Sequence, residues 1–419
     1  MIAVPADGMM KGMLEEPVRR RVLGFEDEAG GVSEGEVTFR WVRDGVEFAA
    51  LEPVWDTLLE RCETVSPFMR WDWVWRWWVA NADLFEPAIC VAEEAGEVVA
   101  MAPFAIGKEE KGSRRGLKQL GLMAGLGEAQ GERINVMIPA ERVEELAPAL
   151  LGRLADLTGQ WDAVRWNRIP AESAILHHLM CALREITANS EVLNTTSCRF
   201  LRMEQETWEA FETSRSRNWR RNQKRLRKEL EEAFGVTYHT GTIAPNGEDV
   251  VEALLRLHAK QFEGEKSFFT SDRALVLHRD LIPLWEAQGK SQMCYLMAGG
   301  KVISVVQVLH EGRVSYAFQV GRDLAYGETS VGSATFGWAV ECAFRSGARS
   351  LDFLAGDFEY KRRWTAETRT VLDLEGYAPW SWRARVFLLL RWLRRKTMKP
   401  KVQAGKVEAG ESGESDAVG

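Results

Sequence analysis

The chain has 419 residues, of which 46% are hydrophobic and 27% are charged, a composition typical of a soluble globular protein. At about 150 residues per domain, this length predicts two domains with tails. The formal net charge of −7 gives the chain as a whole no affinity for polyanions, so we expect no double-stranded nucleic acid as a partner. Any binding of anions must therefore depend on a local cluster of cationic side chains.

Cysteine and histidine usage indicates a reduced compartment and no metal centre. The six cysteines form no CxxC motif, and the six histidines lack metal-ligand spacing. The segment 9–21 is interrupted by charges where a secretory signal needs an apolar region, and no run of about 18 apolar residues occurs. We therefore expect a cytoplasmic protein with no membrane-spanning helix.

Residues 1–36 are rich in Gly, Glu and Met and show no sustained periodicity, so we expect a flexible extension there. We expect residues 37–195 to form a first domain. Apolar alternation predicts strands in this domain, and 3.6-residue periodicity predicts helices. The expected strands are 37–43, 88–93, 97–106, 117–122, 133–138 and 162–169. The expected helices are 48–61, 71–79, 141–157 and 172–186.

The two halves of the chain share a hairpin pattern. At one fixed shift, Cys90 aligns with Cys294, Gly96 with Gly300, and Val98 with Val302. Self-similarity over such a distance predicts a duplicated domain, although hairpins also resemble one another by chance. We expect the first copy to be the non-catalytic one, because no helix follows its glycine-rich loop at 121–127 at once.

Residues 196–379 predict the second domain. Its expected strands are 198–203, 235–239, 293–297, 301–310, 314–320, 351–354 and 369–377, and its expected helices are 207–234, 248–262, 272–287 and 330–345.

One predicted helix of the second domain carries a cationic stripe. Arg217, Arg221, Lys224 and Lys228 recur at spacings of three and four, and no acidic residue appears in this run before Glu229. A solvated surface is the usual explanation of such a run. The lack of interleaved acids in an acidic chain favours an anion-facing role, so we expect Arg217, Arg221 and Lys224 to bind substrate phosphates or a lipid head group.

Chemically active side chains gather directly after the predicted strand 351–354. Asp352, Asp357, Tyr360, Lys361 and Trp364 lie within 13 residues, around Gly356. Ligands of open α/β sheets bind beyond the carboxyl ends of strands, which favours a site here. The alternative is a charged surface loop whose aromatic side chains only cap the core.

The order of three antiparallel strands, a helix and a return strand, together with four short segments, resembles a known family. The segments 326–333, 345–347, 352–356 and 360–361 are similar to BioF-type and CelD-type acetyltransferase domains, relatives of the Fem aminoacyl transferases. The resemblance covers residues 200–380. It implies an α/β (α+β) fold of tandem GNAT-like (acyl-CoA N-acyltransferase) domains, each a mixed, mostly antiparallel sheet flanked by helices.

The resemblance also implies an activity. It indicates an acyltransferase that uses acyl-CoA, such as acetyl-CoA, to modify an amine or hydroxyl of a polysaccharide, peptidoglycan or lipid precursor of the cell envelope. The usual acetyl-CoA loop reads Gln/Arg-x-x-Gly-x-Gly/Ala, but here only Gly327 and Gly332 lie in the loop, at another separation. An aminoacyl-tRNA donor and a binding module without turnover therefore remain alternatives.

The resemblance assigns roles to individual residues. Strands 314–320 and 351–354 would part to admit the pantetheine arm. Tyr360 would be the general acid, Asp352 or Asp357 the proton acceptor and Lys361 an anion clamp. Donor-binding residues would be Gly327, Ser330, Val331, Gly332 and Ser333 at a helix N-terminus. Apart from the resemblance, the cationic stripe and the charged loop give Arg217, Arg221, Lys224 and Trp364 as the expected substrate-binding residues.

The segment 380–399 predicts a basic amphipathic helix. One face of this helix carries Trp382, Val386, Leu389, Leu390 and Leu393, with arginines at its sides. This pattern is typical of a helix at the surface of an anionic membrane, which would make the protein peripheral to the inner membrane. The alternative is that the same stripe packs on the first domain. Residues 400–419 predict a disordered tail.

Overall fold

The computed structural model describes residues 36–397, except 109–112, 115, 264–267 and 327–329. The expected N-terminal extension and C-terminal tail fall outside the described residues, apart from Glu36.

The strands form one 13-stranded sheet in the order β1-β2-β3-β5-β6-β13-β7-β12-β11-β10-β9-β8, with β4 beside β5. Two neighbouring pairs, β5/β6 and β11/β12, are parallel, and the other pairs along this order are antiparallel. This confirms the expected mixed, mostly antiparallel sheet. In sheet order the strands are β1 (Val37–Val42), β2 (Phe85–Glu94), β3 (Glu97–Gly107), β5 (Leu117–Leu122), β6 (Ala163–Pro170), β13 (Thr368–Tyr377), β7 (Asn189–Arg202), β12 (Ser350–Ala355), β11 (Val314–Arg322), β10 (Lys301–Glu311), β9 (Ser291–Ala298) and β8 (Thr237–Thr240), and β4 is Ser113–Arg114.

The sheet repeats one pattern in its two halves. Leaving β4 aside, each half has six strands in the same order: an edge strand, the two strands of a hairpin, an antiparallel fourth strand, a parallel fifth strand and an antiparallel last strand. Even the irregularity in the hairpin recurs, because β2 and β3 pair Glu93 with Val98 and then Ala92 with Ala100, while β9 and β10 pair Met297 with Val302 and then Leu296 with Ser304. This register matches the shift seen in the sequence and supports the duplication.

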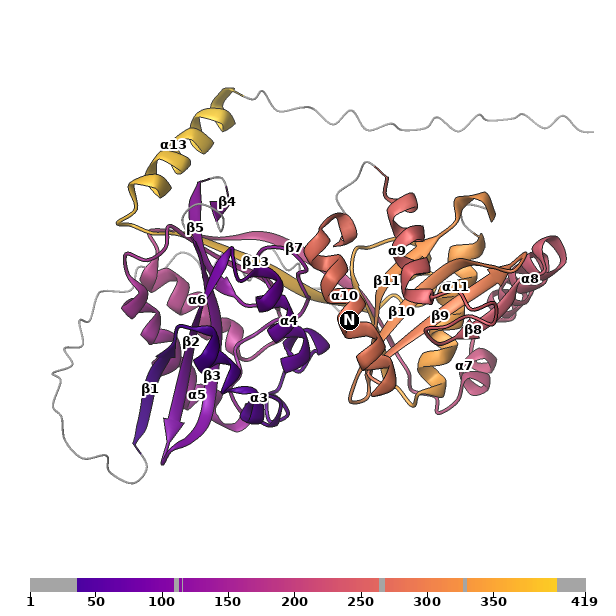
Figure 1. Cartoon of the computed structure of the whole chain (residues 1–419), viewed down its shortest axis with the longest axis horizontal. Helices are drawn as coiled ribbons and strands as arrows, with labels where there is room; N and C mark the ends of the chain where they lie inside the picture. The colour runs from indigo at the N-terminus through magenta and orange to yellow at the C-terminus, as the bar shows by residue number, and fades with distance from the viewer. Residues whose placement is uncertain (1–35, 109–112, 115, 264–267, 327–329, 398–419) are drawn as a thin grey trace, which may run out of the picture. The chain divides into compact units, whose positions relative to one another are not determined.

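The last strand of each half comes from elsewhere in the chain. β13 follows the second half in sequence but pairs with β6 of the first half, and β7 pairs with β12 of the second. β7 and β13 then pair with each other and join the halves (Figure 1). The boundary expected between residues 195 and 196 thus falls inside a shared strand.

Helices cover both halves of the sheet (Figure 1). They are α2 (Gly45–Ala49), α3 (Glu52–Leu59), α4 (Trp71–Asn81), α5 (Val143–Gly152), α6 (Ile175–Ile186), α7 (Trp208–Ser214), α8 (Arg217–Phe234), α9 (Val250–Gln261), α10 (Asp272–Ala287), α11 (Ser330–Arg345), α12 (Glu359–Arg362) and α13 (Trp382–Thr397). Short 3₁₀ turns are η1 (Pro67–Met69), η2 (Ala140–Arg142), η3 (Arg153–Leu157), η4 (Phe268–Thr270) and η5 (Leu324–Tyr326). No helix within the described ranges is long and apolar enough to cross a membrane.

Several predicted elements differ from the structure. The helix expected over 48–61 is divided into α2 and α3. The helix expected over 207–234 is broken at Arg215, which is extended, because Thr207 and Ser216 each cap a separate helix through their side chains. The strand expected over 133–138 forms only a bridge between Met137 and Met101, and Arg133 has a positive φ of 56°. A positive φ interrupts regular strand geometry, and among the described residues around this one no ladder beyond the single bridge forms.

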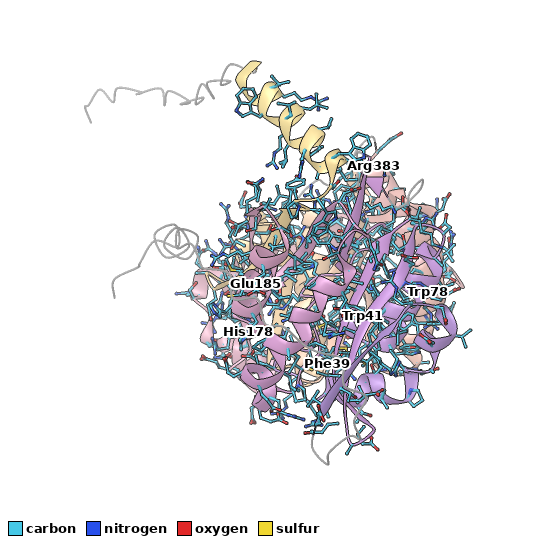
Figure 2. All side chains as sticks on the ribbon, turned by 90° about the vertical axis from the view of Figure 1, so that its left-hand side faces the viewer. Phe39, Trp41, Trp78, His178, Glu185 and Arg383 are labelled. Atoms are coloured by element: carbon cyan, nitrogen blue, oxygen red, sulfur yellow. The ribbon has the colours of Figure 1, made fainter. Side chains whose placement is uncertain are left out.

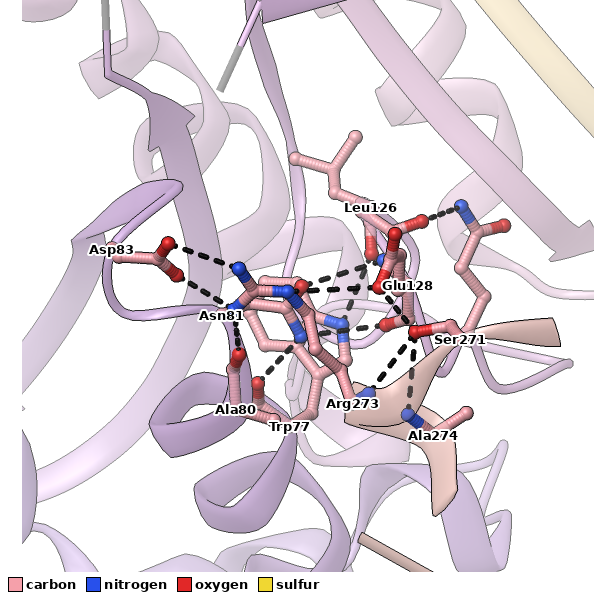
Figure 3. A network of polar contacts seen from close by, with 11 residues as sticks. Trp77, Ala80, Asn81, Asp83, Leu126, Glu128, Ser271, Arg273 and Ala274 are labelled. Atoms are coloured by element: carbon pink, nitrogen blue, oxygen red, sulfur yellow. Dashed lines mark hydrogen bonds and ion pairs between the residues drawn. The ribbon is translucent and has the colours of Figure 1, made fainter. Parts of the chain in front are cut away.

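Aromatic and ionic contacts join the two halves. Trp73 of α4 lies 5.9 Å from Trp285 of α10 and 5.5 Å from Phe318 of β11, measured between ring centroids. Arg273 at the start of α10 donates to the Asp83 carboxylate at 2.6 and 2.9 Å (Figure 3). The tryptophan-rich helix α4 is therefore wedged against the second half.

Candidate active site

The site begins where two parallel strands part. β11 and β12 pair only from Val314 and Ser350 to Tyr316 and Asp352, although β11 runs on to Arg322. β12 turns away because its pairing with β7 is irregular after Asp352 and because the chain bends at Leu354, which has a φ of 56°. The later residues of β11 are left without a β12 partner, as the resemblance implies.

A cavity of about 360 Å³ lies at the end of β11, which we call the β11 cavity. The first turn of α11 and the loop after β12 complete its walls, which carry apolar, polar and charged side chains. It is lined by Gln261, Phe262, Val320, Arg322, Gly332, Ser333, Phe336, Phe358, Glu359, Tyr360 and Arg363.

A second cavity of about 520 Å³ lies against α8, which we call the α8 cavity. Three residues, Ser333, Tyr360 and Arg363, line both cavities, so the two spaces meet at these side chains. The remaining lining of the α8 cavity is Ser216, Asn218, Trp219, Asn222, Gln223, Arg225, Leu226, Glu229 and Trp364.

Tyr360 stands at this junction, held by aromatic contacts. Its ring stacks on Phe358 at 5.9 Å and meets Phe336 edge-on at 5.0 Å. Within the described part of the chain its hydroxyl makes no hydrogen bond. Burial raises the pKa of Tyr360 to about 12, against the opposing effect of Arg322. The phenol therefore keeps its proton at neutral pH and can donate it to a ligand.

The N-terminus of α11 provides a place for an anion. Val331 is buried and anchors the first turn, whose N–H groups have no acceptor within the helix. A Cβ added to Gly332 would lie 3.0 Å from Nη1 of Arg322, so this glycine lets a guanidinium approach the helix end. Ser330 is the first residue of α11, and Gly327 lies outside the described residues.

Lys361 does not fit the expected anion clamp. The side chain is buried, and Nζ donates to the carbonyl oxygens of Phe353, Leu354 and Ala355 at 2.6, 3.3 and 2.9 Å. All three hydrogens of the ammonium group have acceptors in the bend that ends β12. Lys361 therefore stabilises that bend, and it lines neither the β11 cavity nor the α8 cavity.

The two aspartates do not fit the role of proton acceptor. Asp352 is fully buried, accepts a hydrogen bond from the Leu354 amide at 2.8 Å and lies 3.8 Å from Nη1 of Arg133. Burial raises its pKa. Asp357 pairs with Arg199 and Arg362, and these hydrogen bonds lower its pKa. Neither carboxylate lines the two cavities.

The cationic stripe of α8 is displaced by one residue from the side that faces the α8 cavity. Asn218, Asn222, Arg225 and Glu229 line this cavity, whereas Arg217 and Arg221 are exposed and line neither cavity. One residue is about 100° around a helix, which decides which side chains a ligand meets. The same spacing of three and four, read one position later, would have identified the polar side chains.

The other two expected substrate-binding residues, Lys224 and Trp364, line different cavities. Lys224 lines a separate cavity with Trp208 and Lys228. Trp364 does line the α8 cavity, and its indole meets that of Trp219 at 5.4 Å and 81°. Sequence reasoning did not single out Arg322, Arg363 and Phe358, because their approach to the α11 N-terminus depends on how the strands part.

Comparison with known proteins agrees with this geometry. Residues 217–362 match the family model described as an acetyltransferase (GNAT) domain. The chain has a GNAT-type fold. No curated protein matches it in sequence.

Solved structures are similar to this chain at low identity, and FemX among them shows the same fold. FemX is 10% identical, with a TM-score of 0.52, over 81% of this chain and 98% of its own. A conserved protein of unknown function from Bacteroides thetaiotaomicron VPI-5482 is 12% identical, with a TM-score of 0.48, over 78% of this chain and 97% of its own. A tandem GNAT protein from the clavulanic acid biosynthesis pathway is 10% identical, with a TM-score of 0.44, over 83% of this chain and 100% of its own.

Proposed function

We propose that this protein is a GNAT-type acyltransferase that moves an acyl group from acyl-CoA to an amine or hydroxyl of a cell-envelope precursor. The observation that carries the proposal is the meeting of two cavities at Tyr360 and Ser333, beside the gap between β11 and β12. Within the GNAT fold we place the chain with the BioF-type and CelD-type acetyltransferases, on the segments 326–333 and 352–361.

The β11 cavity fits the acyl donor. Past Tyr316, the edge of β11 offers backbone groups that β12 does not use, and these can bond the amides of a pantetheine arm. Val320, Phe336 and Phe358 provide an apolar wall for an acyl chain. The α11 N-terminus and Arg322 suit the pyrophosphate. Acyl-CoA would supply the acyl group as a thioester.

Tyr360 would assist departure of the thiolate. As the acceptor nitrogen or oxygen bonds to the acyl carbon, the carbon–sulfur bond breaks and Tyr360 Oη gives its proton to the sulfur. The acceptor loses its own proton to solvent. The Tyr360 phenolate then takes a proton from solvent and becomes a phenol again. A phenol with a pKa of about 12 is protonated at neutral pH and therefore carries the proton that this role requires.

The α8 cavity would hold the acceptor. Trp219 and Trp364 offer apolar ring surfaces, while Asn218, Asn222 and Gln223 offer amides that donate and accept hydrogen bonds. Flat aromatic surfaces beside side-chain amides suit a molecule that carries many hydroxyl or amide groups. A sugar-containing envelope precursor has this chemistry.

The test is release of free thiol by the purified full chain, with acyl-CoA donors of increasing length and amino-sugar acceptors. Tyr360→Phe should lower kcat about 10² to 10³-fold with little change in KM for the donor, because general acid catalysis is typically of this size. Tyr238→Phe, a half-buried tyrosine on β8, is the matched control and should leave kcat unchanged.

Full activity of Tyr360→Phe would remove the assigned role. Binding of acyl-CoA without thiol release under any acceptor would favour the non-catalytic binding module. Turnover with aminoacyl-tRNA and none with acyl-CoA would show that the donor is an aminoacyl-tRNA, and the assignment of the active site would stand.

A further inference from the structure

α13 packs on the first half of the sheet through only one of its sides. Phe387 stacks on Tyr377 of β13 with ring centroids 5.6 Å apart. Arg391, on the same side, pairs with Glu191 at 2.6 Å and Glu375 at 2.8 Å. The packed cluster comprises Leu117, Ala163, Tyr377, Ala384, Phe387 and Leu388. The helix therefore docks on its own protein, but through this side and not, as the alternative had it, through the predicted stripe.

The opposite side of α13 is apolar and exposed. Trp382 is 68% exposed, Val386 45%, Leu389 55% and Leu390 49%. Their spacing of four, three and one places them on one face, which is the stripe predicted from the sequence. Figure 2 shows α13 at the margin of the protein, where it rises from Arg383. We call these four residues the outer face.

Four exposed apolar side chains on one face of a helix that is packed on its other side are typical of an interaction surface. Exposure of hydrophobic side chains to water is unfavourable. The inner side already anchors the helix, so the outer face is not needed to hold α13 in place.

The charge around the outer face selects the partner. Apart from Arg391, which is paired on the inner side, residues 382–397 contain arginines at 383, 385, 394 and 395 and a lysine at 396, without an acidic residue, in a chain whose net charge is −7. A second copy of α13 would bring cations against cations, which opposes self-association. An anionic lipid surface complements both the cations and the apolar strip between them.

We propose that the outer face of α13 binds the headgroup region of an anionic lipid bilayer, with Trp382, Val386, Leu389 and Leu390 inserted below the headgroups and Arg383, Arg385 and Arg394 beside phosphates. Trp382 at the start of the helix suits the boundary between headgroups and acyl chains. The proposal is independent of acyl transfer, because it uses no residue of the two cavities.

The experiment is co-sedimentation of the purified full chain with phosphatidylcholine vesicles that contain phosphatidylglycerol, and with vesicles of phosphatidylcholine alone. We expect binding to the anionic vesicles, weakening with added salt. Leu389→Glu/Leu390→Glu should lower the bound fraction about tenfold or more, because charged side chains do not enter the acyl region.

The matched control is Val79→Glu/Val276→Glu, which adds the same charge on α4 and α10 at two valines that are each 55% exposed. This control should bind vesicles nearly as the unaltered chain does. Equal far-ultraviolet circular dichroism of the two variants shows that each is folded.

Three results would overturn the proposal. One is no binding to either vesicle. Another is equal loss of binding in the test and control variants. A third is a dimer of the unaltered chain that Leu389→Glu/Leu390→Glu converts to a monomer without any lipid binding, which would assign the outer face to self-association.

Discussion

Lys361 carries its ammonium group into the bend that ends β12, where three carbonyl oxygens accept its hydrogens. Burial lowers the pKa of Lys361 from 10.5 to about 8. The bend redirects the chain from β12 toward Tyr360, so one buried cation sets the course of the loop that carries the proposed acid. Its contribution is to position that loop.

Replacing Lys361 by Met should destabilise the fold by about 2 kcal/mol at pH 7, because buried carbonyls lose a charged donor. Between pH 8 and 10.5 the unfolded chain holds a proton that the folded chain has released, so the stability of the unaltered protein should rise with pH in this window, and this group should add no pH dependence below or above it. The variant should lack this part of the pH dependence. Urea unfolding at pH 7, 8 and 10 measures both effects.

Lys224→Met, at an exposed position of α8, is the control and should change stability little. A Lys361→Met protein of normal stability that binds acyl-CoA more weakly would restore the anion clamp and contradict the structural role.

At the scale of elements, the gap between β11 and β12 depends on how β11 packs on α9. A Cβ on Gly321 would lie 2.9 Å from the backbone nitrogen of His258 and 2.9 Å from the carbonyl oxygen of Leu254. Only glycine allows β11 to approach the helix backbone this closely. Val320 and Arg322, on either side of Gly321, line the β11 cavity.

Gly321→Ala should therefore destabilise the protein by about 1 to 3 kcal/mol, since the strand and the helix must separate. Because the cavity wall moves with the strand, affinity for acyl-CoA should fall as well. Urea unfolding and isothermal titration calorimetry measure the two effects.

The comparison variant is Gly152→Ala at the end of α5, where an added Cβ meets no atom within 4 Å. That change should be neutral or slightly stabilising. If both glycine variants behave alike, close packing of β11 on α9 does not set the cavity.

At the scale of the whole molecule, the two halves hold each other's last strand. β13 lies between β6 and β7, and it supplies the residues Val371, Leu372 and Leu374 to the interior. A fragment that ends before β7 would lose β13 and leave the length of β6 unpaired on one side. Unpaired edges of this kind aggregate.

We therefore expect residues 36–188 alone to be insoluble or unfolded, and co-expression with residues 189–397 to recover a folded complex. Size-exclusion chromatography and circular dichroism of the separate and co-expressed fragments measure this. A fragment of residues 36–188 that unfolds cooperatively by itself would show that the strand exchange is not needed for folding.

Local signals in the sequence were enough for most elements. The predicted helices 272–287 and 330–345 match α10 and α11 at both ends. The repeated hairpin predicted the duplication because its register depends on residues close in sequence. Prediction failed where one position mattered, as at Arg215. Ser216 caps the N-terminus of a new helix there, although periodicity predicts one continuous helix.

For the site, Tyr360, Trp364, Gly332 and Ser333 could be placed at the cavities from motif and order alone. The roles of Lys361, Asp352 and Asp357 could not be read this way. Whether a charged side chain meets a ligand or a buried carbonyl depends on burial, and burial arises from the packing of distant segments.

The sequence by itself determined the GNAT-type order of strands and helices, the doubling of the hairpin and the amphipathic stripe of the last helix, because each is a pattern of neighbouring residues. Only the tertiary structure decided the exchange of β7 and β13, the side of α8 that faces the cavity, and the exposure of the outer face of α13. These features rest on contacts between residues far apart in the chain, and the energy of such contacts depends on packing geometry that no local pattern contains.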